Sequence, residues 1–362
     1  MLAYIAAACN DPRFSVDTNR IYLHGQSMGG KGTLTVGLRH PDVFACIVPF
    51  LPPIDTGMTN IMVRNPAGNF PPITDYFGSK DSPEFGMAGH RLLFQTCIQT
   101  HNGVWSQWGN HGHQPAGNPA TLVFGSFLRF RKNELFPAFT NSTKDWNYGV
   151  PNPAVYDSIG AVNSYIDWTS SLHDMGLAND DLVDCVDSIV ITAKSPLAGT
   201  LVDVTPRRVQ HFQAQAGNTY YWRNVDVATD TLAASGTVKA DANGLVTIKA
   251  VALCRTGNRL IIKNSGGNRT APSLSCARLP EGIEAGPNPF TSLVSFSVPE
   301  AVRSVVLYSV NGKKIARFST PQTVSRGRIS FQWDAAGFPA GAYVLKAALA
   351  GRTMVKRIVL IR

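Results

Sequence analysis

Residues 25–29 read Gly-Gln-Ser-Met-Gly, so Ser27 stands at the centre of a GxSxG pentapeptide. A serine becomes a nucleophile when a neighbouring base takes its proton, and the two glycines permit the sharp strand-to-helix turn that exposes such a hydroxyl. A strand-like segment at 20–23 precedes the pentapeptide and a helix-compatible segment follows it, which favours a nucleophile elbow over an ordinary glycine-rich turn. The backbone N–H of Met28 would then begin a helix and could stabilise an oxyanion.

A carboxylate follows this serine in the chain order that such chemistry requires, which is serine, then acid, then histidine. Residues 72–77 indicate a short strand, and Asp81 follows that strand in a turn. Functional groups in open α/β sheets lie beyond the carboxyl ends of the strands, so Asp81 is placed to meet Ser27. Asp75 lies inside the predicted strand, where a buried, hydrogen-bonded carboxylate is a better interpretation than a catalytic acid.

Two histidines follow the next predicted strand, at residues 104–108. His111 is nearer to the end of that strand, and Gly112 lets the backbone turn tightly around its ring. We therefore expect His111 to be the base that takes the proton of Ser27, with His113 as the alternative base. The pair could also bind a metal ion, but no carboxylate or cysteine accompanies it in a ligand pattern, so we expect neither a metal nor a cofactor.

The elements that would position these residues alternate between strand and helix. Ser82 and Pro83 suit the cap and the first position of a helix, and an apolar stripe continues this helix to about residue 102. Strands that alternate with helices favour a parallel sheet with helices on its faces. Ser27, Asp81 and one histidine would then converge at one edge of this sheet.

Two stretches around the pentapeptide, residues 16–23 (Val-Asp-Thr-Asn-Arg-Ile-Tyr-Leu) and 39–49 (Arg-His-Pro-Asp-Val-Phe-Ala-Cys-Ile-Val-Pro), carry a family resemblance. They resemble the α/β-hydrolase superfamily, specifically its secreted esterase and polyhydroxybutyrate-depolymerase-like group. The resemblance covers about the first 135 residues and implies a parallel sheet flanked by helices, with ester hydrolysis through an acyl-enzyme. It implies that Ser27 is the nucleophile, Met28 an oxyanion donor, Asp81 the acid and His111 the base.

The sequence departs from this family before the elbow. Members carry early strands there, together with a loop that donates a second oxyanion N–H, whereas only residues 1–19 precede the elbow strand here. Residues 1–9 look like the helix just before that strand. We therefore expect an N-terminally truncated hydrolase domain with the elbow strand at a sheet edge. Losing one oxyanion donor costs ~100 to 1000-fold in turnover, so we expect weak or no activity from this fragment.

The composition changes in the second half of the chain. From about residue 187, helix-like patterns give way to short alternating strands separated by turn residues, with a hairpin turn at 241–244. We expect a multidomain chain that begins with the C-terminal part of an α/β-hydrolase domain. The four expected parts are this hydrolase domain at 1–135, an extension or linker packed on it at 136–187, and two small immunoglobulin-like β-sandwich domains at 188–280 and 281–362.

Four motifs follow one another in the last part of the chain, at residues 286–290, 306–313, 338–344 and 356–362. In this order they resemble a type IX secretion sorting domain, a bacterial C-terminal β-sandwich module. The alternative is an unrelated immunoglobulin-like domain, because Asn-Gly turns and alternating strands are common to such sandwiches. The resemblance implies an export address, with the secretion machinery as partner and a secreted or cell-surface location.

The formal net charge of +9 is mild for a chain of 362 residues. We interpret the small basic clusters at 207–208 and at 129–132 as solvated faces, and no motif for nucleic acid or phosphate is present. We therefore expect no nucleic-acid partner. The sequence has no run of 18 apolar residues, so we also expect no membrane span.

The six cysteines leave the redox compartment open. Cys254 and Cys276 could form a bridge between the predicted third part and the segment after it. Cys9, Cys46 and Cys97 lie on apolar faces of predicted elements, and we expect them to be buried thiols.

Two hypotheses for function follow. The first is a secreted serine esterase that acts on a polyester or on acyl groups of a polysaccharide. The second is a non-catalytic surface protein that carries a hydrolase remnant beside its β-domains. A serine peptidase of the prolyl-oligopeptidase kind is a further alternative, because it shares the elbow and the order of the three residues.

Overall fold

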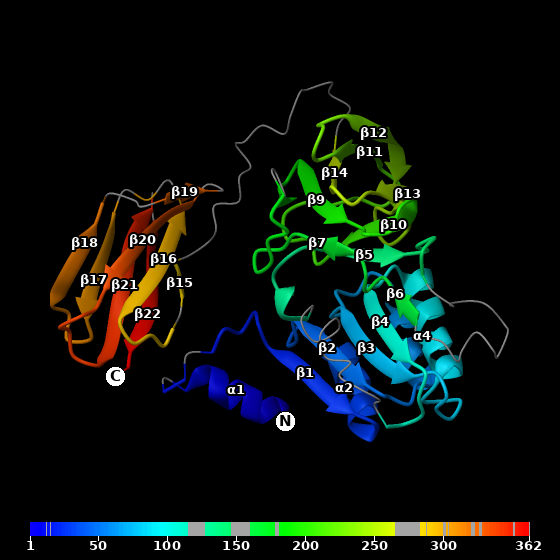
Figure 1. Ribbon diagram of the computed structural model, residues 1–362, viewed down its shortest axis with the longest axis horizontal. Coiled ribbons are helices and arrows are strands. Elements are labelled where there is room, and N and C mark those ends of the chain that lie inside the picture. Colours follow the sequence, from blue (N-terminus) through cyan, green and yellow to red (C-terminus); the bar gives the residue numbers. More distant parts are fainter. Residues whose placement is uncertain are drawn as a thin grey trace. The chain divides into compact units, whose positions relative to one another are not determined.

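Figure 1 shows the computed structural model of the chain. It describes residues 1–361 except 12, 15, 115–126, 146–159, 178–180, 265–282, 287, 300, 301, 303, 320–322, 326, 327, 350 and 351. The chain divides into two compact units, and each is described by itself. The first comprises Met1–Asp11 and Val16–Pro272, and the second comprises Pro12–Ser15 and Ser273–Arg362. The chain is therefore multidomain, and strands outnumber helices among its described elements.

A five-stranded sheet in the first unit bears the residues that the sequence singles out. Its strands pair in the order β1-β2-β3-β4-β6, with the first four parallel and the last antiparallel. They are β1 (Tyr22–Gln26), β2 (Cys46–Phe50), β3 (Ile73–Gly78), β4 (Val104–Gly109) and β6 (Gly160–Val162). The helices are α1 (Leu2–Asn10), α2 (Met28–Arg39), α3 (Thr56–Arg64) and α4 (Met87–Thr100). Among the described strands, β1 pairs with β2 alone, so it lies at a sheet edge.

Both faces of this sheet are buried. One face packs on the helices through a core that includes Leu34, Phe77 and Phe94. The other face packs on the strand-rich part of the same unit, where Trp105 of β4 stacks on Trp168 at a ring distance of 4.8 Å. Coverage on both sides explains why β2 and β3 are buried along their whole length and why β2 reads as a continuous apolar run.

The strand-rich part of the first unit consists of two sheets, drawn in green to yellow in Figure 1. A three-stranded sheet has the order β13-β10-β5, and a larger sheet has the order β12-β11-β14-β9-β7 with β8 also paired to β9. These strands are β5 (Phe136–Thr140), β7 (Asp167–Trp168), β8 (Leu182–Asp184), β9 (Ser188–Lys194), β10 (Thr200–Arg207), β11 (Thr219–Asp226), β12 (Leu232–Lys239), β13 (Ile248–Leu253) and β14 (Asn258–Lys263).

The strand-rich part shares one hydrophobic core with the α/β sheet. Phe139 of β5, Val202 of β10 and Ile262 of β14 belong to the same buried cluster as Val48 of β2 and Trp105 of β4. The sequence predicts separate parts at 1–135, 136–187 and 188–280, but the described residues of 1–11 and 16–264 lie in one compact unit. The difference arises because local patterns report the type of each element and not the long-range packing of one sheet on another.

Two adjacent arginines hold the strand-rich part against the α/β sheet. Arg207 and Arg208 are each only 2 % exposed, which contradicts their interpretation as a solvated face. Arg207 donates to the carbonyls of residues 66 and 68, and Arg208 donates to those of residues 41, 44, 45 and 69. Burial lowers the pKa of both guanidinium groups to about 10. The two guanidinium groups thus donate to backbone carbonyls of several loops of the α/β part and satisfy their own buried N–H groups there.

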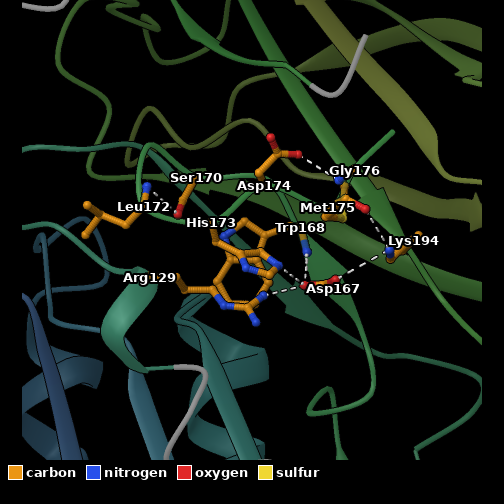
Figure 2. Close-up of polar contacts among 10 residues, drawn as sticks. All are labelled: Arg129, Asp167, Trp168, Ser170, Leu172, His173, Asp174, Met175, Gly176 and Lys194. Atoms are coloured by element: carbon orange, nitrogen blue, oxygen red, sulfur yellow. Dashed lines mark hydrogen bonds and ion pairs between the residues drawn. The ribbon is translucent and has the colours of Figure 1, made fainter. Parts of the chain in front are cut away.

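A second polar cluster, centred on Asp167, lies in the same strand-rich part (Figure 2). Its carboxylate accepts from Arg129 and from His173 Nε2 at 2.9 Å, and Lys194 Nζ lies 3.8 Å away. The Arg129 guanidinium also lies 4.4 Å from the centre of the Trp168 ring, a cation–π contact. Arg129 is thus a structural link between the 3₁₀ turn η1 (Phe127–Arg129) and β7, not part of a solvated face.

The second unit has two four-stranded sheets around one core. The sheets have the orders β15-β16-β20-β19 and β18-β17-β21-β22. The core includes Phe296, Leu307, Phe331, Trp333 and Leu345, which come from both sheets. The strands are β15 (Glu284–Gly286), β16 (Leu293–Pro299), β17 (Val305–Ser309), β18 (Lys314–Phe318), β19 (Thr323–Ser325), β20 (Arg328–Asp334), β21 (Gly341–Leu349) and β22 (Arg352–Leu360).

The cysteines only partly follow the sequence-based expectation. Cys46 and Cys97 are fully buried, but Cys9 is half-buried on α1, a helix without any buried residue. The expected pair of Cys254 and Cys276 includes a residue outside the described part of the chain. Within that described part, no helix combines the length and the apolar character needed to cross a membrane.

Candidate functional site

The turn between β1 and α2 holds Ser27 in a strained conformation. Its backbone has φ 56° and ψ −122°, values that a residue with a Cβ rarely adopts. A Cβ at Gly25 would lie 2.3 Å from the carbonyl oxygen of Gly29, and one at Gly30 would lie 3.0 Å from that of Phe50. The Ser27 N–H donates to this Phe50 carbonyl at 2.8 Å. Close approach of the backbone therefore requires glycine at Gly25 and leaves little room at Gly30, whereas a Cβ at Gly29 would meet no atom within 4 Å.

Met28 is the first residue of the 12-residue helix α2. The N–H groups of a first helical turn have no acceptor within their own helix, and the helix dipole places partial positive charge there. The Met28 side chain is 65 % exposed, so it does not fill the core. The expected place of this residue, directly after the serine and at a helix N-terminus, agrees with the structure.

His113 connects Ser27 to Asp81. Its Nε2 lies 2.8 Å from Ser27 Oγ, and its Nδ1 lies 2.7 Å from Asp81 Oδ2. A carboxylate only accepts hydrogen bonds, so Nδ1 carries the hydrogen and Nε2 is left to accept the serine hydroxyl. The other carboxylate oxygen accepts from the N–H of Ser82 at 2.8 Å. The ring of Phe85 packs edge-on against His113, with 4.7 Å between ring centres.

The accessibility of these groups differs in a way that suits a reaction at the surface. The His113 side chain is 41 % exposed, whereas the Asp81 carboxylate is only 8 % exposed. The histidine therefore faces solvent while its acidic partner is shielded behind it. Shielding from water strengthens the interaction between the carboxylate and the ring.

His111 does not take the position that the sequence analysis expects, because its ring turns back into the sheet. It is 9 % exposed and stacks on Tyr76, and its Nε2 lies 2.8 Å from the Tyr76 hydroxyl. Its Nδ1 donates to the Gly112 carbonyl at 2.7 Å. The alternative, His113, is the histidine beside Ser27. Proximity to the strand end does not favour His111 as the base. His111, which is nearer to the sheet, packs on it, whereas His113, two positions later, reaches past the sheet edge to Ser27.

Two glycines make the space that the His111 ring occupies. Gly78 and Gly109 are direct partners in the pairing of β3 with β4. A Cβ at Gly78 would lie 2.7 Å from His111 Nδ1, and one at Gly109 would lie 2.6 Å from its Cδ2. The His111 carbonyl also accepts from the N–H of Lys80 at 3.0 Å. His111 thereby joins the loop that bears Asp81 to the loop that bears His113, and the paired glycines were the sequence signal for it.

A second set of serine, histidine and aspartate side chains lies inside the same sheet. Asp75 of β3 accepts from Ser106 Oγ of β4 at 2.8 Å, and His90 Nε2 of α4 lies 3.3 Å from the same carboxylate oxygen. Asp75, His90 and Ser106 are all 0 % exposed. This agrees with the interpretation of Asp75 as a buried structural carboxylate. No local pattern indicates the contact with His90, because it depends on how α4 packs on the sheet.

The ring nitrogens of the His-X-His pair are occupied by protein groups. His111 binds Tyr76 and Gly112, and His113 binds Ser27 and Asp81. Among the residues that the structure describes, no group of three or more histidine, cysteine, aspartate or glutamate side chains is arranged to hold a metal ion.

Comparisons with known proteins identify the C-terminal part of the chain. Residues 286–361 match the model of the secretion system C-terminal sorting domain. A C-terminal sorting domain of this type marks a secreted or cell-surface protein, and that location is assigned to this chain.

Among solved structures, the chain is similar to the apoenzyme of S-formylglutathione hydrolase (FrmB) from Staphylococcus aureus, with 17 % identity and a TM-score of 0.27. The match covers 31 % of this chain and 51 % of that hydrolase, so the chain spans about half of its length. No curated protein matches the chain.

Proposed function

We propose that this protein is a secreted serine hydrolase that cleaves carboxylic esters, with Ser27 as nucleophile, His113 as base and Asp81 as acid. The observation that carries the proposal is the arrangement of the three side chains: His113 lies between the other two, 2.8 Å from Ser27 Oγ and 2.7 Å from Asp81 Oδ2. The bridging histidine lies beside a serine that is held at φ 56° directly before a helix. Together these features match the roles that define a serine hydrolase site.

The proposed reaction begins with transfer of the Ser27 hydroxyl proton to His113 Nε2 while Oγ attacks the ester carbonyl carbon. The carbonyl oxygen becomes an oxyanion, and the N–H of Met28 at the start of α2 donates to it. The carbon–oxygen bond to the leaving alcohol then breaks, and the alkoxide takes the proton from His113. An acyl group remains on Ser27.

The second half of the proposed reaction repeats these roles with water. His113 removes a proton from a water molecule, which attacks the acyl carbon, and the proton then returns to Ser27 Oγ as the carboxylic acid leaves. Asp81 holds Nδ1 protonated throughout, so that Nε2 is the atom that exchanges protons. The 41 % exposure of the His113 side chain leaves room for a substrate from solvent.

The test is covalent labelling of the full chain with a fluorophosphonate, which reacts with an activated serine and not with an ordinary one. We expect labelling of the wild-type chain and none of Ser27→Ala or His113→Ala. Labelling of the wild type that persists in Ser27→Ala would overturn the assignment. Absence of labelling in all variants would favour the second hypothesis, a non-catalytic surface protein.

The substrate class is tested next on the same chain. We expect turnover of acetyl, feruloyl or hydroxybutyrate esters, because the proposal is an esterase that acts on a polyester or an acylated polysaccharide. Cleavage of a proline-containing peptide anilide, without cleavage of any ester, would instead favour a peptidase of the prolyl-oligopeptidase kind.

A further inference from the structure

The positive charge of this chain is concentrated in its sorting domain. Residues 286–361 hold ten of the 33 lysine and arginine residues but only two of the 24 aspartate and glutamate residues, which gives +8 of the total formal charge of +9. The rest of the chain is therefore nearly neutral. Such a strong asymmetry between two parts of one chain indicates an anionic partner for the charged part.

Strand pairing places several of these cations on one face of the sheet β18-β17-β21-β22. Val306 of β17 lies opposite Arg317 of β18 on one side and opposite Lys346 of β21 on the other. Tyr308, two residues along β17, lies opposite Lys314. Directly opposed residues share a face, so Lys314, Arg317 and Lys346 point to the same side as Val306 and Tyr308. All three cations are exposed.

This basic face, defined by Lys314, Arg317 and Lys346, is the outer side of the sheet. The alternate residues Val305, Leu307 and Leu345 form the core of the unit on the inner side. The four strands of this sheet contain no aspartate or glutamate. The acidic residues of the other sheet lie in β15 and β20, as Glu284 and Asp334. No acidic side chain in the strands of this sheet therefore offsets these three cations, and exposed Arg357, which lies opposite Val344, adds a fourth to the same face.

The side chains between these cations are short and mostly aliphatic. Val306, Val344 and Val355 lie on the same face, and Val355 is 61 % exposed. Tyr308 also lies on this face, and amphipathic tyrosine rings are typical of membrane–water interfaces. Cations on both sides of β17, with apolar side chains between them and no acidic residue in the four strands, fit an extended and densely anionic partner. A bilayer that contains anionic lipids has both properties.

We propose that the basic face of the sorting domain docks on an anionic lipid surface, with Lys314, Arg317 and Lys346 directed at the headgroup phosphates. Each cation near such a surface strengthens binding by about five-fold, so three of them contribute about 100-fold. Binding of this kind is reversible, and it weakens as salt screens the charges. The proposal concerns the second unit alone and does not depend on the proposed hydrolase activity.

The test is sedimentation of the full chain with phosphatidylcholine vesicles that contain or lack 30 % phosphatidylglycerol, a mixture chosen to be about one-third anionic. We expect binding only to the anionic vesicles, with loss as sodium chloride is raised. The variant Lys314→Glu/Arg317→Glu/Lys346→Glu is expected to bind at least about 100-fold more weakly. The exchanged variant Lys314→Arg/Arg317→Lys/Lys346→Arg should bind like the wild type.

A control variant with the same change of formal charge distinguishes the effect of the basic face on vesicle binding from the effect of net charge. Arg223→Glu/Lys239→Glu/Lys249→Glu alters three exposed cations of the first unit. We expect this control to retain most of the binding. Equal loss in the control, binding to neutral vesicles, or absence of binding to anionic vesicles would each overturn the proposal. Binding to soluble polyglutamate but not to vesicles would overturn it in favour of an acidic protein partner.

Discussion

Two sets of serine, histidine and aspartate are positioned by one sheet of the first unit and its flanking turns and helix, and they differ in which residue stands in the middle. In the exposed set, His113 bridges Ser27 and Asp81. In the buried set, Asp75 bridges Ser106 and His90. The residue types are the same, but only the first arrangement leaves a histidine nitrogen to accept the serine hydroxyl.

Two properties therefore distinguish a reactive set from a structural one: which residue lies between the other two, and whether solvent can reach the set. A histidine between serine and carboxylate can move a proton from one to the other. A carboxylate between serine and histidine can only join the elements that bear them, here β3, β4 and α4. The buried set is 0 % exposed, so no substrate can reach it without unfolding.

The largest expected effect is on ester turnover, where substitution of Ser27 should differ sharply from substitution of Ser106. Ser27→Ala should lower kcat for an activated ester by about 10³-fold or more, because it removes the nucleophile from a site that has a single identified oxyanion donor. Ser106→Ala should change turnover per folded molecule by less than about ten-fold, because Ser106 touches no reacting atom. The measurement is hydrolysis of p-nitrophenyl acetate, scaled to folded protein by circular dichroism. Similar losses in both variants would contradict the assignment.

The two histidines of these sets should differ in their effect on stability. His90→Phe keeps an aromatic ring where His90 stacks on Phe77, but it removes the ring nitrogen that lies 3.3 Å from the buried Asp75 carboxylate. We expect a loss of about 1–3 kcal/mol in the free energy of unfolding by urea, because a buried polar group loses its neighbour. The double variant His90→Phe/Asp75→Leu should recover most of it, since replacing both polar partners by apolar groups can be nearly neutral.

A smaller effect on activity is expected at His111, which belongs to neither set. His111→Gln loses the ring that fills the space between Gly78 and Gly109, so the loops with Asp81 and His113 should shift. Displacement of about 1 Å can cost about 100-fold in kcat. We expect the fluorophosphonate to label this variant slowly, whereas His113→Ala should not be labelled. Loss of labelling equal to that of His113→Ala would mean that His111 acts directly.

The smallest effect concerns a thiol beside the buried set. Burial, followed by the charge of Asp75, raises the pKa of Cys97 to about 12. Cys97 is therefore protonated at pH 8, and we expect no alkylation by iodoacetamide in the native chain over an hour, as read by mass spectrometry. The half-buried Cys9 is the control that should react. Alkylation of Cys97 at the rate of Cys9 would show that solvent reaches the buried set.

The local features of the site were largely predictable from the sequence. Strands were expected at 72–77 and 104–108, and they lie at Ile73–Gly78 and Val104–Gly109. The elbow was expected from the order of strand, GxSxG and helix, and Gly25 meets a local steric requirement there because a Cβ would lie 2.3 Å from the Gly29 carbonyl oxygen. Asp81 and Met28 also lie where the order of elements places them.

The remaining features depend on contacts between distant parts of the chain. The choice between His111 and His113 depends on the space left by Gly78 and Gly109, which strand proximity does not reveal. Likewise, Arg207 and Arg208 carry a charge that is usual for exposed positions. Their burial follows from carbonyls more than 130 residues away in the chain, so no local pattern indicates it.

The buried guanidinium groups of Arg207 and Arg208 limit how far the first unit can be shortened from its C-terminal side. A chain cut after residue 135 would retain Ser27, Asp81 and His113 but lose both arginines, the partners of carbonyls at residues 41, 44, 45, 66 and 68. It would also bare Trp105 on the sheet face that now meets Trp168. Anyone who seeks a minimal version of the proposed hydrolase should therefore retain the chain through β14, to residue 264.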